Sequence, residues 1–171
     1  MTVWIIAAGG AGEPFLPVFR EYKAAVFSYK EGGDTSKMTE AEMIAAFEGK
    51  PYLETPRKII SSDNARRYAR EMIKIRDHVE RGDYLYAPLK KNTEFLIGRV
   101  KKDPYRYEPE HDRDHRHLVR TKWAPTVTAA EIAEELGALV VSKLPTFRHT
   151  IRAPKVYQAE LTAYADKLFQ Q

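Results

Sequence analysis

The sequence predicts an α+β fold: a twisted, mostly antiparallel β-barrel flanked by four or five helices. Its central stretch holds three short segments rich in β-forming residues, at 84–87, 93–101 and 105–107. A polar turn and two prolines separate them, which is typical of a tight antiparallel meander. Helical patterns lie on either side of the meander, at 61–80 and 128–136. A helix that leads directly into a meander indicates a small barrel with helices at its rim.

The first part of the chain is predicted to contain two strands and a helix. Residues 3–8 (VWIIAA) form a compact apolar run, which predicts a buried strand with Trp4 facing opposite to its neighbours. A helix is expected over 14–22 and a second strand over 24–29. The glycines between 9 and 12 are predicted to form a turn. They are not expected to form a phosphate loop, because they lack the lysine and the spacing of that motif.

Capping signals mark the starts of the later helices. Thr39-x-x-Glu42 and Thr128-x-x-Glu131 are capping boxes, and the polar residues from Ser61 can cap the helix that runs to about Glu80. Alternation over 115–123 predicts another strand. A final helix is expected over residues 157–169, after a short apolar piece at 139–141.

Composition limits the class of protein. The chain has 171 residues, enough for one domain with a single core, and no cysteine for a disulfide framework or a thiolate metal site. A net charge of +4 and a pI near 9.2 permit an anionic partner without requiring one. No apolar run approaches the roughly 20 residues of a membrane span, so we expect a cytoplasmic protein with no membrane partner.

Several short segments follow one another in a characteristic order between residues 3 and 151. They are an initial strand with Trp4, a polar loop and helix start at 61–66 (SSDNAR), Met72 leading to Gly82-Asp83 and an aromatic strand, then 95–100 (FLIGRV), 105–107 (YRY) and the basic strand 117–123 (HLVRTKW). This order resembles the EVE domain of the PUA-like superfamily. It is more similar still to the EVE-like N-terminal domain of Mrr-type modification-dependent restriction endonucleases.

The resemblance implies a PUA-like/EVE-like nucleic-acid-binding domain over residues 1–152, with 153–171 as a C-terminal helix or the start of a linker. It implies a module that reads a modified base in double-stranded DNA, with modified cytosine as the leading candidate, by flipping the base into an aromatic pocket. Such a module is the targeting part of a restriction system, and any nuclease domain would lie elsewhere in the same or another chain. The alternative is a PUA-like protein that recognises structured or modified RNA.

Two positions depart from the family pattern. Ser28-Tyr29 stands where the Mrr-type domains tend to have a glycine followed by tryptophan, and Ser61-Ser62 stands near the Val-Arg of the EVE pattern.

A reader of an extruded base needs an aromatic surface to replace stacking and polar groups for the base edge. Four strand aromatics are candidates, although aromatic residues in a small barrel more often form the core. The resemblance favours Trp4 and Tyr29 among them. The start of the predicted helix at 61 supplies donors and acceptors, with ordinary capping as the alternative role. The candidate pocket is therefore Trp4, Tyr29, Ser61, Ser62, Asp63, Asn64, Tyr86 and Trp123.

Two basic stripes are candidates for phosphate contacts. One recurs at four-residue intervals on the predicted helix, and the other lies along the predicted strand at 115–123. A solvated charged face is the commoner explanation of a single stripe. Two stripes on neighbouring elements favour a groove, whose residues would be Arg66, Arg70, Lys74, Arg116, Arg120 and Lys122.

A third hypothesis is a metal-dependent or hydrolytic enzyme that uses the Asp- and His-rich segment 111–117. Both residue types are suitable metal ligands. No ligand-spacing motif is complete in this segment, however, and no carboxylate pair or nucleophile–base set stands out. We therefore expect a binding domain with no catalytic residues, no metal and no cofactor.

Overall fold

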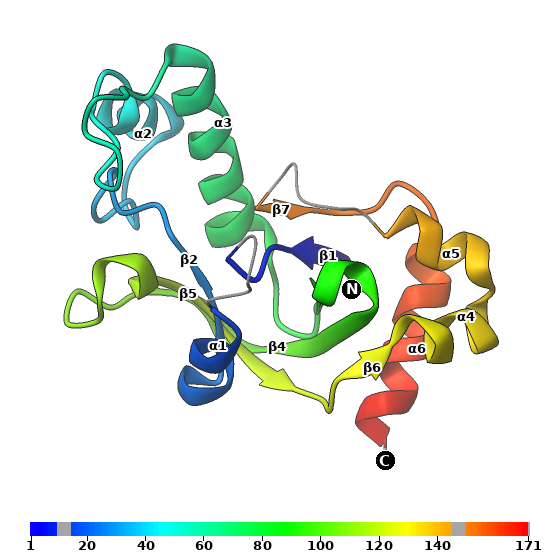
Figure 1. Cartoon of the computed structure of the whole chain (residues 1–171). Coiled ribbons are helices and arrows are strands. Elements are labelled where there is room, and N and C mark those ends of the chain that lie inside the picture. The colour runs from blue at the N-terminus through cyan, green and yellow to red at the C-terminus, as the bar shows by residue number, and fades with distance from the viewer. Residues whose placement is uncertain (10–14, 145–149, 171) are drawn as a thin grey trace.

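The computed structural model describes residues 1–9, 15–144 and 150–170, and it confirms the α+β class (Figure 1). Its strands are β1 (Val3–Ile6), β2 (Ala24–Phe27), β3 (Tyr84–Leu89), β4 (Glu94–Tyr107), β5 (His117–Trp123), β6 (Val127–Thr128) and β7 (Ile151–Arg152). They form one sheet in the order β2-β5-β4-β3-β1-β7, and β6 pairs with β4 outside this path.

The expected closed barrel is wrong for the part of the chain that the structure describes. The path of paired strands begins at β2 and ends at β7, so the sheet is open. β1 pairs in parallel with β3, whereas the other pairs are antiparallel. The edge strands that a barrel would have to join, β2 and β7, do not pair with each other among the described residues.

Six α-helices lie within the described residues, one more than the upper expectation. They are α1 (Leu16–Tyr22), α2 (Glu40–Phe47), α3 (Ser62–Ile73), α4 (Ala129–Leu136), α5 (Ala138–Lys143) and α6 (Gln158–Gln170), and α3 continues into a π-helical turn over Lys74–His78. α5 was not predicted from the sequence, because six residues are too few to show helical periodicity. The segment 153–171, expected as a helix or the start of a linker, contains α6.

Both faces of the sheet are buried, each under its own group of helices. α1, α2 and α3 contribute to one hydrophobic cluster, and α4, α5 and α6 contribute to the other. The last three helices gather on one side of the sheet in Figure 1. Neighbouring strand residues therefore enter different clusters: Trp4 packs in the first, and Val3 and Ile5 pack in the second. This arrangement confirms the predicted orientation of Trp4. It also explains why the sequence of β1 is an uninterrupted apolar run, since both faces of the strand are buried.

Two prolines that were expected to end strands lie inside them. Pro88 is opposite Phe95 in the β3–β4 register. The last pair between β3 and β1 is Tyr86 with Ile5, so Pro88 has no partner on that side and its missing N–H group costs nothing. β4 likewise runs through Pro104, with a register shift between Val100 and Tyr105 against β5. The expected break is a β-bulge that bends one long strand.

The capping predictions are confirmed. Thr39 and Thr128 each accept a hydrogen bond from the backbone N–H three residues later, and the glutamate carboxylate there accepts one from the backbone N–H of the threonine. Ser61 caps α3 by accepting from the backbone N–H of Asn64. The strand predicted from His115 begins only at His117, because residues 113–115 form a short 3₁₀ turn. None of the described helices combines the length and the apolar character needed to cross a bilayer.

Candidate nucleic-acid interface

The four candidate aromatic residues do not come together in one pocket. Trp4 and Tyr29 belong to the hydrophobic cluster under α1, α2 and α3, whereas Tyr86 belongs to the cluster on the opposite face. Trp123 is half-buried beside the first cluster. The sheet therefore separates Tyr86 from the other three side chains.

Local partners satisfy the polar atoms of the three buried aromatics. The Trp4 indole donates to Asp83 Oδ2 at 2.8 Å, and the Tyr86 hydroxyl donates to the Leu161 carbonyl at 2.7 Å. The Tyr29 hydroxyl donates to Glu71 Oε2 at 2.6 Å. Burial raises the pKa of both tyrosines, so both hydroxyls keep their protons. The structure places these three side chains in the core.

The candidate base-edge residues lie at the start of α3. Ser62 Oγ bonds Glu48, and Asp63 pairs with Arg66 at 3.4 Å. Ser61 and Asn64 have a different environment, because both line a surface pocket of about 640 Å³ with four residues from the segment between α2 and α3. We call this the Tyr52 pocket, and its lining residues are Tyr52, Thr55, Lys58, Ile59, Ser61 and Asn64.

Acidic neighbours partly neutralise the basic stripe on α3. Besides the pair of Arg66 with Asp63, Arg70 lies 3.5 Å from Glu40 of α2, and Lys74 is half-buried. Directly before β5, Arg116 donates to the His111 carbonyl at 3.0 Å, and on β5 Arg120 is half-buried. Lys122 is exposed, and among these six residues it is the one that lines a second described cavity.

This second cavity, the Trp123 cavity, has a volume of about 790 Å³ and a cationic lining. Four of its side chains carry a positive charge, and none carries a negative charge. The lining residues are Arg20, Lys23, Lys101, Thr121, Lys122, Trp123, Ala124, Pro125 and Thr126. Three of these basic residues were not among the predicted phosphate contacts. Arg20 lies on α1, Lys23 directly follows α1, and Lys101 lies in the bent part of β4. No spacing in the sequence relates these three elements.

Contacts on two sides hold the Trp123 side chain in place. Its indole N–H donates to the Phe19 carbonyl at 2.9 Å, and its ring stacks on the Phe19 ring with centroids 5.3 Å apart. Gly98 of β4 lies beside the same ring and has no side chain to displace it. At the rim, Arg20 Nη2 donates to Thr126 Oγ1 at 3.0 Å, which joins α1 to the segment after β5. The cavity is therefore built on ordered elements.

Replacing Gly98 with alanine is expected to lower the free energy of unfolding by about 1–3 kcal/mol, the usual cost of overpacking. A Cβ atom there would lie 2.3 Å from Thr121 Cγ2 and 2.5 Å from Trp123 Cε3, so both side chains would have to move. Urea unfolding measures the stability, and tryptophan emission reports the displaced ring. Wild-type stability with unchanged emission would contradict this packing.

The Asp- and His-rich segment is occupied by packing contacts. His111 stacks on Tyr22 with centroids 4.3 Å apart, and His115 packs edge-on against Phe15 at 5.4 Å. Asp114 lies 2.6 Å from Lys30 Nζ. Across residues 1–9, 15–144 and 150–170, no group of three or more potential metal ligands gathers in one place.

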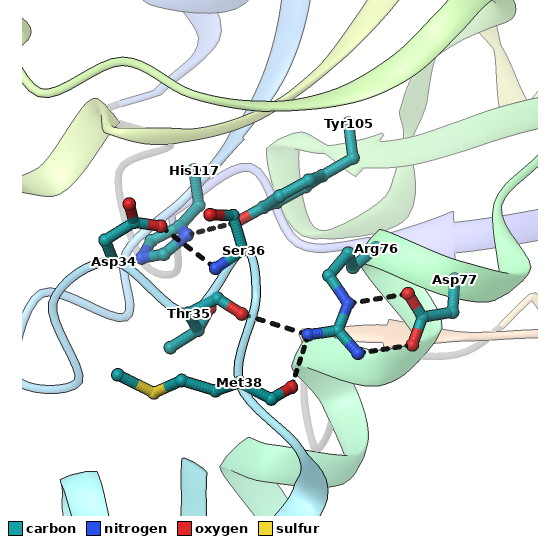
Figure 2. Close-up of polar contacts among 8 residues, drawn as sticks. All are labelled: Asp34, Thr35, Ser36, Met38, Arg76, Asp77, Tyr105 and His117. Atoms are coloured by element: carbon teal, nitrogen blue, oxygen red, sulfur yellow. Dashed lines mark hydrogen bonds and ion pairs between the residues drawn. The ribbon is translucent and has the colours of Figure 1, made fainter. Parts of the chain in front are cut away.

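His117 belongs instead to a polar network under the sheet, shown in Figure 2. Its Nδ1 atom shares a hydrogen bond of 3.0 Å with the Tyr105 hydroxyl. Next to this pair, Arg76 donates to the carbonyls of Thr35 at 3.0 Å and Met38 at 2.6 Å, and it pairs with Asp77. These contacts join residues 34–38 to the π-helical turn and indicate a structural role for the network.

Comparison with protein-family models, with curated proteins and with solved structures finds no match. The chain is therefore characterised by its own features: an α+β protein with an open mixed sheet, an ordered cationic cavity beside α1, and a polar and aromatic pocket at the start of α3.

Proposed function

We propose that this chain is a nucleic-acid-binding module with a PUA-like, EVE-like fold. Its leading ligand is double-stranded DNA that carries a modified base, with modified cytosine first, and it would serve as the targeting part of a modification-dependent restriction system. The observation that carries the proposal is the Trp123 cavity, whose lining includes four cationic residues and no acidic residue. The family resemblance of the sequence supports the choice of ligand.

The charge of the cavity suits a phosphate backbone. Arg20, Lys23 and Lys122 are exposed, and no described carboxylate forms an ion pair with them or with Lys101. An anion that binds at this cavity is attracted by several cationic residues at once. Arginine and lysine are the side chains that most often hold phosphate oxygens in protein–DNA complexes.

Removing the cavity's lysines is expected to weaken duplex binding and reduce its salt dependence. In a variant with Lys23, Lys101 and Lys122 replaced by alanine, the slope of log affinity against log salt should fall by about 2.7, or 0.9 for each of three phosphates. The matched control replaces Lys37, Lys143 and Lys155, which are exposed and lie outside the cavity. Both variants change the net charge from +4 to +1 (4 − 3), so they differ only in position.

Titration of duplex DNA, single-stranded DNA and duplex RNA at several salt concentrations provides the measurement. Equal losses in the two triple variants would mean that net charge, and not the cavity, attracts the ligand. Tighter binding of RNA would select the alternative ligand, and no binding to any of the three would refute the proposal.

A further inference from the structure

The Tyr52 pocket lies on an ordered hairpin between α2 and α3. Residues 49–60 fold back on themselves through a bridge between Pro51 and Ile59. Backbone hydrogen bonds connect the two arms: Tyr52 N–H donates to the Lys58 carbonyl at 3.0 Å and Ile60 N–H to the Lys50 carbonyl at 2.8 Å. Two prolines, Pro51 and Pro56, lie in this segment, and no sequence pattern in it predicts a hairpin. The hairpin holds its side chains in defined positions against the start of α3.

Two hydrogen bonds of its hydroxyl group orient the Tyr52 ring. Asn64 Nδ2 donates to this hydroxyl at 3.1 Å, and the Tyr68 hydroxyl lies 3.2 Å from it. Burial, with the neighbouring Tyr52, raises the pKa of Tyr68 to about 12, so Tyr68 keeps its proton at neutral pH. Because the ring is half-buried and already ordered, its side chain loses little conformational entropy when a ligand stacks on it.

The other lining residues supply complementary chemistry. Ser61 and Thr55 contribute hydroxyl groups, Asn64 has an amide oxygen that is not used in its bond to Tyr52, and Lys58 contributes an ammonium group. Ile59 is 66% exposed, an unusual state for a large apolar side chain. An aromatic face, an apolar wall, hydrogen-bonding groups and one cation are the features that a nucleotide site requires.

We propose that the Tyr52 pocket receives a single nucleobase extruded from its strand. The base stacks on Tyr52, its polar edge meets Asn64 and Ser61, and Lys58 contacts a phosphate of the same strand. Ile59 covers an apolar substituent such as a methyl group. This inference rests on the proposed function and deepens it, because it moves base recognition from the buried Trp4 and Tyr29 to a hairpin at the surface.

The pocket and the Trp123 cavity lie in different parts of the molecule. The pocket is lined by the hairpin between α2 and α3 and by the start of α3, whereas the cavity is lined by residues of α1, β4 and β5 and the segment after β5. The start of α3 and α1 lie far apart in Figure 1. They share no lining residue, so a substitution in one leaves the lining of the other intact. Phosphate contacts set overall affinity, and base contacts set selectivity. The two sites therefore predict different results in the same assay.

The test measures binding to five duplexes that differ at one central pair: cytosine, 5-methylcytosine, 5-hydroxymethylcytosine, N6-methyladenine, and a T·G mismatch whose base is easily extruded. Tyr52→Ala should weaken binding of the preferred duplex about 5- to 150-fold, which corresponds to the usual contribution of one base–aromatic stack. The affinity for the most weakly bound duplex should change by less than about twofold. Tyr52→Phe should retain most of the affinity. Ile59→Ala should reduce any preference for a methyl group about fourfold.

Asn64→Ala is the second variant, because it alters the pocket while leaving the Tyr52 ring present. It should also reduce selectivity among the duplexes. Both variants are assayed at a temperature at which circular dichroism shows them folded. If all five duplexes bind Tyr52→Ala and Asn64→Ala as they bind the wild type, or if the wild type binds all five equally, the inference is overturned. The proposed function survives the first of these results if the cavity variant still loses affinity and salt dependence. Equal binding of all five duplexes by the wild type would also remove the modified base from the proposed function, and the function fails entirely if the wild type binds no nucleic acid.

Discussion

Replacing Tyr29 with alanine is expected to lower the free energy of unfolding by about 3–5 kcal/mol, the usual cost of removing a buried aromatic side chain. Tyr29 is 4% exposed, and its ring packs edge-on against Phe47 and Tyr68 with centroids 6.2 and 5.7 Å away. The variant also loses the hydroxyl that donates to Glu71. Because the side chain lies in the core, any loss of ligand binding should follow the loss of folded protein.

Urea unfolding followed by circular dichroism measures this effect. Tyr29→Phe is the matched variant: it keeps the ring and loses only the 2.6 Å hydrogen bond to a carboxylate, so a cost of about 1.5–3 kcal/mol is expected. An alanine variant within 1 kcal/mol of the wild type would contradict the core assignment. If that stable variant also lost its preference for a modified duplex, Tyr29 would contact the base directly, as the family resemblance implies.

Lowering the pH from 6.5 to 4 is expected to cost about 3 kcal/mol of stability through His117 alone. This imidazole is fully buried, and burial lowers its pKa from 6.5 to about 4 despite the nearby Asp34 carboxylate and the Gly33 backbone, which raise it. The charge of Arg116 contributes to the lowering of this pKa, in the same direction as burial. Between these two pH values the unfolded chain binds a proton that the folded protein does not bind. The free energy of unfolding therefore falls as the pH falls, and it is fully recovered above pH 6.5.

The measurement is urea unfolding at half-unit steps from pH 4 to pH 7.5, for the wild type and for His117→Gln. Glutamine keeps a polar side chain near Tyr105 but does not titrate, so the stability difference between the two proteins should shrink as the pH falls toward 4. Carboxylates such as Asp77 and Asp114, whose pKa values are lowered by ion pairing, act equally in both proteins and cancel. Parallel stability curves would show that His117 does not titrate in this range.

Local patterns predicted most of the secondary structure. A capping box depends on residues three positions apart, so Thr39 and Thr128 could be interpreted without knowledge of the rest of the chain. The alternation of Trp4 with Val3 and Ile5 likewise follows from strand geometry. Where the pattern was short or contradictory the prediction failed, as at α5 and at the two prolines inside β3 and β4.

The candidate site was predicted less completely, because a surface site depends on elements distant in sequence. Of the proposed pocket residues, Ser61 and Asn64 line one cavity and Trp123 lines the other, together with Lys122 from the proposed phosphate contacts. Tyr52 was not recognised, because nothing in the sequence indicates that a proline-containing loop folds into a hairpin. Arg20, Lys23 and Lys101 were missed for a similar reason, since only the bend in β4 and the packing of α1 bring them together.

The sequence by itself determined the helix starts, the apolar strands, the positive net charge and the absence of cysteine, because each depends on composition or on neighbouring residues. Only the tertiary structure decided that the sheet stays open, that Tyr29 and Tyr86 lie in different cores, and that Trp123 lies among four cations. Burial and charge convergence depend on which distant elements pack together. Strand pairing and helix packing, which involve residues more than a hundred positions apart, set those contacts.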